Sequence, residues 1–212
     1  MFYKIKYINL QAQHNSIKNE IKKKIENIFS RSAFILRQEV LDFEKKITKL
    51  LKVKYCIALN SGTDALLMSL SQLKIEKGEE IIVPSHTYVA SVGTIKHIGA
   101  EPVFVDIRDD FNLDPNDIIK KITKKTRAIM VVHLNGRCCE MDKIMNIAKK
   151  YKLQVIEDCA QAFGSKFNNK NAGSFGLSGA FSLHPMKNLN VPGDGGFLIT
   201  NNKKVYTNVL LL

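Results

Sequence analysis

The sequence predicts an α/β fold in which a mostly parallel sheet is covered by helices on both faces. From residue 55 to residue 157, short apolar runs alternate with segments of helical periodicity, which is the order of repeated β-α-β units. The chain has 212 residues, of which 45% are hydrophobic and 25% are charged, so it can bury one sizeable core of this kind. In such folds, ligands bind beyond the carboxyl ends of the strands.

Two amphipathic helices are expected before the first strand. Residues 16–29 carry isoleucines on one face with lysines and glutamates between them, and residues 38–51 repeat the pattern with other apolar side chains. After these helices, the spacing of the apolar residues is no longer helical. The apolar run 55–59 predicts a strand, and a tight turn at 60–63 leads into a third helix with leucines at helical spacing up to Leu73.

The same alternation continues along the chain, with a strand predicted wherever a short apolar run stands between two helical patterns. Asp114 is expected to cap one of these helices. The further strands are expected at 80–84, 102–105, 127–133 and 153–157, and the further helices at 87–98, 114–122 and 140–151.

The last third differs because glycines divide it into loops. Apolar runs at 179–184 and 195–200 predict two neighbouring strands that lead in and out of a turn holding Lys187. Pro185 and the glycine cluster 193–196 prevent a helix from absorbing this lysine.

The formal charge of +12 raises the possibility of a nucleic-acid-binding protein. However, only five of the 32 basic residues are arginine, and the lysines are scattered among acidic residues in the predicted helices. This distribution is typical of solvated helix faces. Nucleic acid is therefore not an expected partner.

The four cysteines have no Cys-x-x-Cys spacing, so we expect reduced thiols and neither structural zinc nor any other metal site. The apolar runs are too short to span a bilayer, and Met1–Leu10 lacks the apolar region of a signal peptide. We therefore expect a cytoplasmic protein with no membrane partner.

Three features converge on the ligand side of the predicted sheet. The turn Ser61-Gly62-Thr63 begins a helix, where backbone N–H groups, the helix dipole and a hydroxyl can bind phosphate, although such a turn is also a common helix cap. Asp158 follows a buried strand and needs a cationic or N–H partner. Lys187, which could by itself be a surface residue, can act as an amine nucleophile toward a carbonyl.

Together these features match the three attachment points of pyridoxal 5′-phosphate. The turn would hold its phosphate, the carboxylate would keep its pyridine nitrogen protonated, and the lysine would bond to its aldehyde. Each signal is weak alone, but their order in a parallel α/β chain makes the joint interpretation strong.

Several longer motifs are similar to those of the DegT/DnrJ/EryC1/StrS family of nucleotide-sugar aminotransferases, in the family's order. The resemblance extends from Asn9 to Thr200. The motifs are NSGTDAL at 60–66, PSHTYVA at 84–90, VHLNG at 132–136, EDCAQA at 157–162, SLHPMKNL at 182–189 and GDGG at 193–196.

The resemblance implies a fold-type I large domain, similar to that of aspartate aminotransferase, and assigns roles to residues. Lys187 would form the Schiff base, Asp158 would pair with the pyridinium nitrogen, and Gln161 would lie near the ring hydroxyl. Tyr88, which would otherwise be interpreted as a core aromatic residue, would stack on the ring. The cofactor phosphate would be held by Gly62, Thr63 and Ser182.

The implied reaction moves an amino group from an amino acid, usually glutamate, to a keto-sugar nucleotide, in cell-surface polysaccharide or amino-sugar biosynthesis. Lys187 would also carry the proton as general base and acid. Arg37 and Met186 differ from common family residues. Relatives are longer and dimeric, so we expect residues 1–212 to be a large domain truncated before a small C-terminal domain.

Two alternatives remain open. In sugar dehydratases of the same family, histidine usually replaces the lysine, so Lys187 argues against that activity. The chain could instead be an inactive fragment that needs a partner carrying the C-terminal domain.

Overall fold

The computed structural model describes residues 8–212, so the first seven residues of the predicted domain lie outside it. The chain divides into two compact units, one extending to Phe43 and the other comprising Glu44–Leu212. Within the described range, no helix combines the length and the apolar character that crossing a membrane requires.

The first unit contains α1 (Leu10–Ser30) and the beginning of α2 (Gln38–Leu51). The predicted helix at 16–29 is confirmed but starts earlier, because the Asn9 side chain accepts a hydrogen bond from the Ala12 amide at 3.1 Å and caps it. No residue of α1 is buried. Its predicted apolar face is therefore present without being part of a core.

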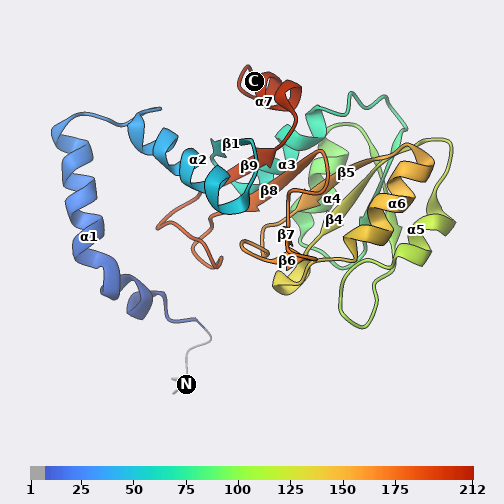
Figure 1. Cartoon of the computed structure of the whole chain (residues 1–212), viewed down its shortest axis with the longest axis horizontal. Helices are drawn as coiled ribbons and strands as arrows, with labels where there is room; N and C mark the ends of the chain where they lie inside the picture. Colours follow the sequence, from blue (N-terminus) through green and yellow to red (C-terminus); the bar gives the residue numbers. More distant parts are fainter. Residues whose placement is uncertain (1–7) are drawn as a thin grey trace. The chain divides into compact units, whose positions relative to one another are not determined.

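The second unit is built on a seven-stranded sheet (Figure 1). Only β9 runs antiparallel to its neighbours, so the predicted mostly parallel sheet is confirmed. The strands are β1 (Tyr55–Leu59), β2 (Glu80–Pro84), β3 (Glu101–Val105), β4 (Thr126–Val132), β5 (Gln154–Asp158), β8 (Ser178–Ser182) and β9 (Gly196–Thr200), in the order β1-β9-β8-β5-β4-β2-β3.

Helices cover both faces of the sheet, as predicted. One core joins α3 (Gly62–Ser71), α4 (Val89–His97) and α7 (Lys203–Val209) to the sheet. The opposite core joins α5 (Pro115–Lys121) and α6 (Met141–Tyr151), which are neighbours in Figure 1. Successive residues of a strand serve different cores: in β2, Ile81 faces the first and Ile82 the second, as the alternation of side chains along a strand requires.

Several elements differ from the prediction. The hairpin β6 (Lys166–Phe167) and β7 (Lys170–Asn171), the 3-10 helix Leu134–Gly136 and α7 were not predicted. Each is too short to display a periodic pattern. The third helix ends at Ser71 and α4 begins at Val89, so those predicted bounds were too wide. The Asp114 cap is confirmed, since its side chain accepts from the Asn116 amide at 2.9 Å.

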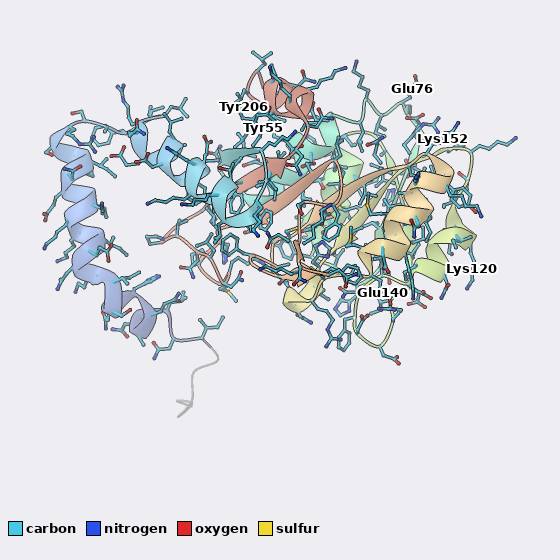
Figure 2. All side chains as sticks on the ribbon, viewed as in Figure 1. Tyr55, Glu76, Lys120, Glu140, Lys152 and Tyr206 are labelled. Carbon is cyan, nitrogen blue, oxygen red and sulfur yellow. The ribbon has the colours of Figure 1, made fainter. Side chains whose placement is uncertain are left out.

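The helix α7 is anchored to β1 by a pair of aromatic rings. Tyr206 of α7 stacks on Tyr55 of β1 with ring centroids 4.5 Å apart (Figure 2). Val205 and Val209, four residues apart, are buried in the first core. Asn202 caps the helix by accepting from the amides of Lys204 and Val205. This cap followed by two valines is the signal that could have predicted α7.

All four cysteines are free thiols, as expected. Cys56, Cys139 and Cys159 are buried, and burial raises the pKa of the half-buried Cys138 to about 11. These thiols are therefore protonated at neutral pH.

The hydroxyl of Ser178 is buried in β8 without a hydrogen-bond partner among residues 8–212. Burying an unpaired hydroxyl costs free energy. We therefore expect Ser178→Ala to raise the free energy of unfolding by about 1 kcal/mol, measured by urea denaturation against the wild type. A clear loss of stability would contradict this prediction.

Candidate functional site

The site lies at the edge of the sheet where the parallel strands β1, β2, β4, β5 and β8 reach their carboxyl ends. A cavity of about 480 Å³ opens there, a size typical of small-molecule sites. All seven residues predicted for the site line it. The lining includes Ser61, Gly62, Thr63, Thr87, Tyr88, His133, Asp158, Gln161, Ser182, Lys187 and Asp194.

The start of α3 forms one end of the cavity, the anion end, and has the features of an anion site. The Ser61 side chain caps the helix by accepting from the Asp64 amide at 3.0 Å. The amides of Gly62 and Thr63 donate to no other residue in the described range. These free N–H groups and the positive end of the helix dipole favour a phosphate.

Two glycines allow the sheet to approach this helix start closely. A Cβ atom on Gly62 would lie 2.8 Å from the Cβ atom of Ser182, and one on Gly196 would lie 2.2 Å from the carbonyl carbon of Ser61. Any larger side chain would push the strands away from the helix. The glycine cluster of the sequence therefore has a packing role at the anion end, in addition to interrupting helical structure.

Asp158 is the last residue of β5. The strand therefore ends one residue later than the sequence predicted. Its carboxylate oxygens accept hydrogen bonds from the Ala160 amide at 3.0 Å and from the Ser91 hydroxyl at 2.8 Å. Burial raises the pKa of Asp158, and these donors and the Lys187 charge oppose this effect only in part. A cationic partner in the cavity would therefore be strongly favoured.

Lys187 lies in the loop between the neighbouring strands β8 and β9, as the predicted turn between two strands requires. Its backbone is fixed on both sides: its amide donates to the His184 carbonyl at 2.8 Å, and its carbonyl accepts from the Asn190 side chain at 2.8 Å. Its ammonium group has no hydrogen bond or ion pair within residues 8–212. The amine is thus held at the cavity and is free to react.

Tyr88 and Gln161 both line the cavity from turns. Tyr88 immediately precedes α4 and is 71% exposed, so it is not the core aromatic residue that the sequence alone suggested. The Gln161 side-chain oxygen accepts from the Asn135 amide at 2.8 Å. This bond directs the remaining NH₂ group of Gln161 away from Asn135.

A buried carboxylate that the sequence did not single out supports the site from behind. Glu157 and Asp158 are consecutive residues of β5. Because side chains alternate along a strand, the two carboxylates lie on opposite faces of the sheet. The Glu157 carboxylate accepts from the amides of Gly173, Phe175 and Gly176, each at 2.7 Å, and pairs with His133 Nε2 at 3.0 Å. A second carboxylate, next to Asp158 and directly after Val155 and Ile156, was the available signal.

His133, Glu157 and Cys159 are close enough to resemble a metal site. Their donor atoms are used otherwise: the Cys139 amide donates to His133 Nδ1 at 3.1 Å, and Glu157 accepts the bonds given above. Burial raises the pKa of Cys159 well above its ordinary value, so its thiol keeps its proton. The cluster is better described as a hydrogen-bond network.

Comparison with known proteins gives consistent results. The model of the DegT/DnrJ/EryC1/StrS aminotransferase family matches residues 15–212. A dTDP-3-amino-3,6-dideoxy-alpha-D-galactopyranose transaminase of Aneurinibacillus thermoaerophilus is 44% identical over 203 residues, covering 95% of this chain and 56% of that protein. A GDP-perosamine synthase of Escherichia coli O157:H7 is 45% identical over 169 residues, covering 79% and 46%.

Solved structures agree. The crystal structure of NtdA from Bacillus subtilis with bound cofactor PMP superposes with a TM-score of 0.91 at 30% identity, covering 99% of this chain and 48% of that one. The chain therefore spans about half the length of the relatives that it matches.

Proposed function

Because the chain belongs to the DegT/DnrJ/EryC1/StrS aminotransferase family, we propose that its cavity binds pyridoxal 5′-phosphate and takes part in amino transfer to a keto-sugar nucleotide. The observation that carries the proposal is the convergence of three groups on one cavity: the free amides at Gly62 and Thr63, the buried Asp158, and the unpaired amine of Lys187.

These groups fit the cofactor chemically. The amides of Gly62 and Thr63, with the Ser182 hydroxyl, would hold the phosphate at the positive end of α3. Asp158, whose raised pKa reflects a buried carboxylate in need of a cation, would bind the protonated ring nitrogen. The exposed ring of Tyr88 offers a stacking surface, and Gln161 offers an NH₂ donor for the ring hydroxyl.

When bound, the cofactor supplies an aldehyde that carries the amino group and a ring that withdraws electrons. Lys187 would hold the aldehyde carbon covalently and, once released, would move the proton during amino transfer. The overall exchange is balanced: the amino acid becomes a 2-oxo acid while the ketone of the sugar becomes an amine.

The substrate class rests on the relatives. One acts on a dTDP sugar and another on a GDP sugar, according to their names, so a keto-sugar nucleotide is the shared class. Glutamate as donor, a homodimeric full-length form and a cytoplasmic location are further proposals, supported by the family resemblance.

The proposal is tested by absorbance spectroscopy of the purified protein with pyridoxal 5′-phosphate. We expect a visible band of lysine-bound cofactor, which glutamate shifts to shorter wavelength and a keto-sugar nucleotide restores. A folded protein that gives no such band would sink the proposal. Cofactor binding without turnover would instead indicate that residues outside these 212 are needed, and a longer protein would then be tested.

Asp158→Asn gives a second test. An amide cannot stabilise the protonated ring nitrogen as a carboxylate does, so we expect amino transfer to slow by about 10²-fold. Single-turnover kinetics with glutamate measures this rate. Asp142→Asn, on the exposed side of α6, is the matched control and should react at the wild-type rate. Equal rates in both variants would mean that Asp158 does not take part in amino transfer.

A further inference from the structure

The Asp158 carboxylate is held by donors from two separate elements. The amide of Ala160, in the turn after β5, donates to Oδ1 at 3.0 Å. The hydroxyl of Ser91, on α4, donates to Oδ2 at 2.8 Å. Ser91 is fully buried, so its hydroxyl is shielded from competition with water.

Thr87 extends this contact into a chain of hydroxyl groups. Its Oγ1 lies 2.7 Å from the Ser91 Oγ. A hydroxyl has one proton, and Ser91 gives its proton to Asp158, so Thr87 must donate to Ser91. Both O–H dipoles then point toward the carboxylate, and hydrogen bonds aligned in this way strengthen one another. This arrangement suits an ionised Asp158.

At the beginning of α4, some side chains line the cavity and another contacts the Asp158 carboxylate. The Ser91 amide donates to the Tyr88 carbonyl at 3.1 Å, so both residues belong to one turn. Tyr88 and Thr87 line the cavity, whereas Ser91 does not. Ser91 is therefore linked to a ligand in the cavity only through Asp158 and Thr87.

Other groups near Asp158 act alongside the Ser91 hydroxyl. Burial raises the pKa of Asp158, while the Ala160 amide, the Ser91 hydroxyl and the charge of Lys187 lower it, in that order. His133 is hydrogen-bonded to Glu157 through Nε2.

We propose that Ser91, directed by Thr87, is a positioning residue that orients the Asp158 carboxylate toward the cofactor ring and keeps it ionised. The part that concerns the ring rests on the proposed function. The part that concerns Asp158 does not, because the hydroxyl chain is a property of the protein itself.

The test follows the ionisation of Asp158 in cofactor-free protein, by difference infrared spectroscopy with ¹³C-labelled aspartate, and Asp158→Asn identifies its signal. We expect the pKa of Asp158 to be higher in Ser91→Ala than in the wild type, and to return toward the wild-type value in Ser91→Thr. Thr87→Val should raise it less. Ser178→Ala also removes a buried hydroxyl, in β8, and should leave the pKa of Asp158 unchanged.

An unaltered Asp158 titration in Ser91→Ala would overturn the proposal. If that variant does not fold, Thr87→Val decides, because valine matches threonine in shape and this residue is only half-buried. In addition, the Kd for pyridoxal 5′-phosphate should rise about tenfold in Ser91→Ala, the value expected for a lost hydrogen bond to a charged group. If the wild type binds no cofactor, the proposed function fails, while the titration still decides the role of Ser91.

Discussion

Lys187→Ala is expected to abolish covalent attachment of pyridoxal 5′-phosphate and to slow amino transfer by roughly 10³-fold or more. Within residues 8–212, the amine of Lys187 has no hydrogen-bond or ion-pair partner, and no other lysine of this range lines the cavity. Removing it would therefore remove both the proposed covalent bond and the proposed proton carrier. Borohydride reduction followed by mass spectrometry measures the attachment, and stopped-flow absorbance measures the rate.

Lys203→Ala is the matched control, since Lys203 is exposed in the first turn of α7. We expect this variant to be labelled and to react as the wild type does. Labelling at another lysine in wild-type protein, or unchanged labelling in Lys187→Ala, would show that Lys187 is not the attachment point.

Glu157→Ala is expected to cause the largest loss of stability, about 4 kcal/mol in the free energy of unfolding. Three amides and the ring of His133 would lose their acceptor in a fully buried place. Each buried donor left without a partner costs free energy. Urea denaturation monitored by circular dichroism gives the difference.

Glu76→Ala is the control for this measurement. Glu76 is exposed, as Figure 2 shows, and its side chain makes no hydrogen bond within the described residues. We expect a change of no more than about 0.5 kcal/mol. A similarly small change in Glu157→Ala would mean that the loop 173–176 is held by other contacts.

The fold was largely predictable because β-α-β alternation is a strong pattern. Strands such as β1 and β2 were predicted with their observed bounds, since apolar runs bounded by turns mark buried strands clearly. The short α7 was missed, because seven residues do not reveal a helical period. The position of β9 between β1 and β8 depends on long-range pairing, which no local pattern contains.

The candidate site residues were predictable from their residue types, but the residues that hydrogen-bond to them were not. Lys187, Asp158 and Gly62 stand beside strands and turns, where sequence alone suggests chemistry. Ser91 is different, because serine inside a helix has many ordinary explanations, and its contact with Asp158 spans 67 positions of the chain. Such partners become visible only when α4 is packed on the sheet that contains β5.

The place of β9 in the sheet also has a consequence for the order in which the chain folds. Among the described strands, β1 pairs with β9 alone, and the two strands are separated by nearly the whole second unit. The close approach of Gly196 to Ser61 means that the anion-binding turn is complete only after this late strand has entered the sheet. Contacts between such distant segments form slowly. A ribosome-bound chain that lacks β9 should therefore already contain the neighbouring parallel strands while still being unable to retain a phosphate.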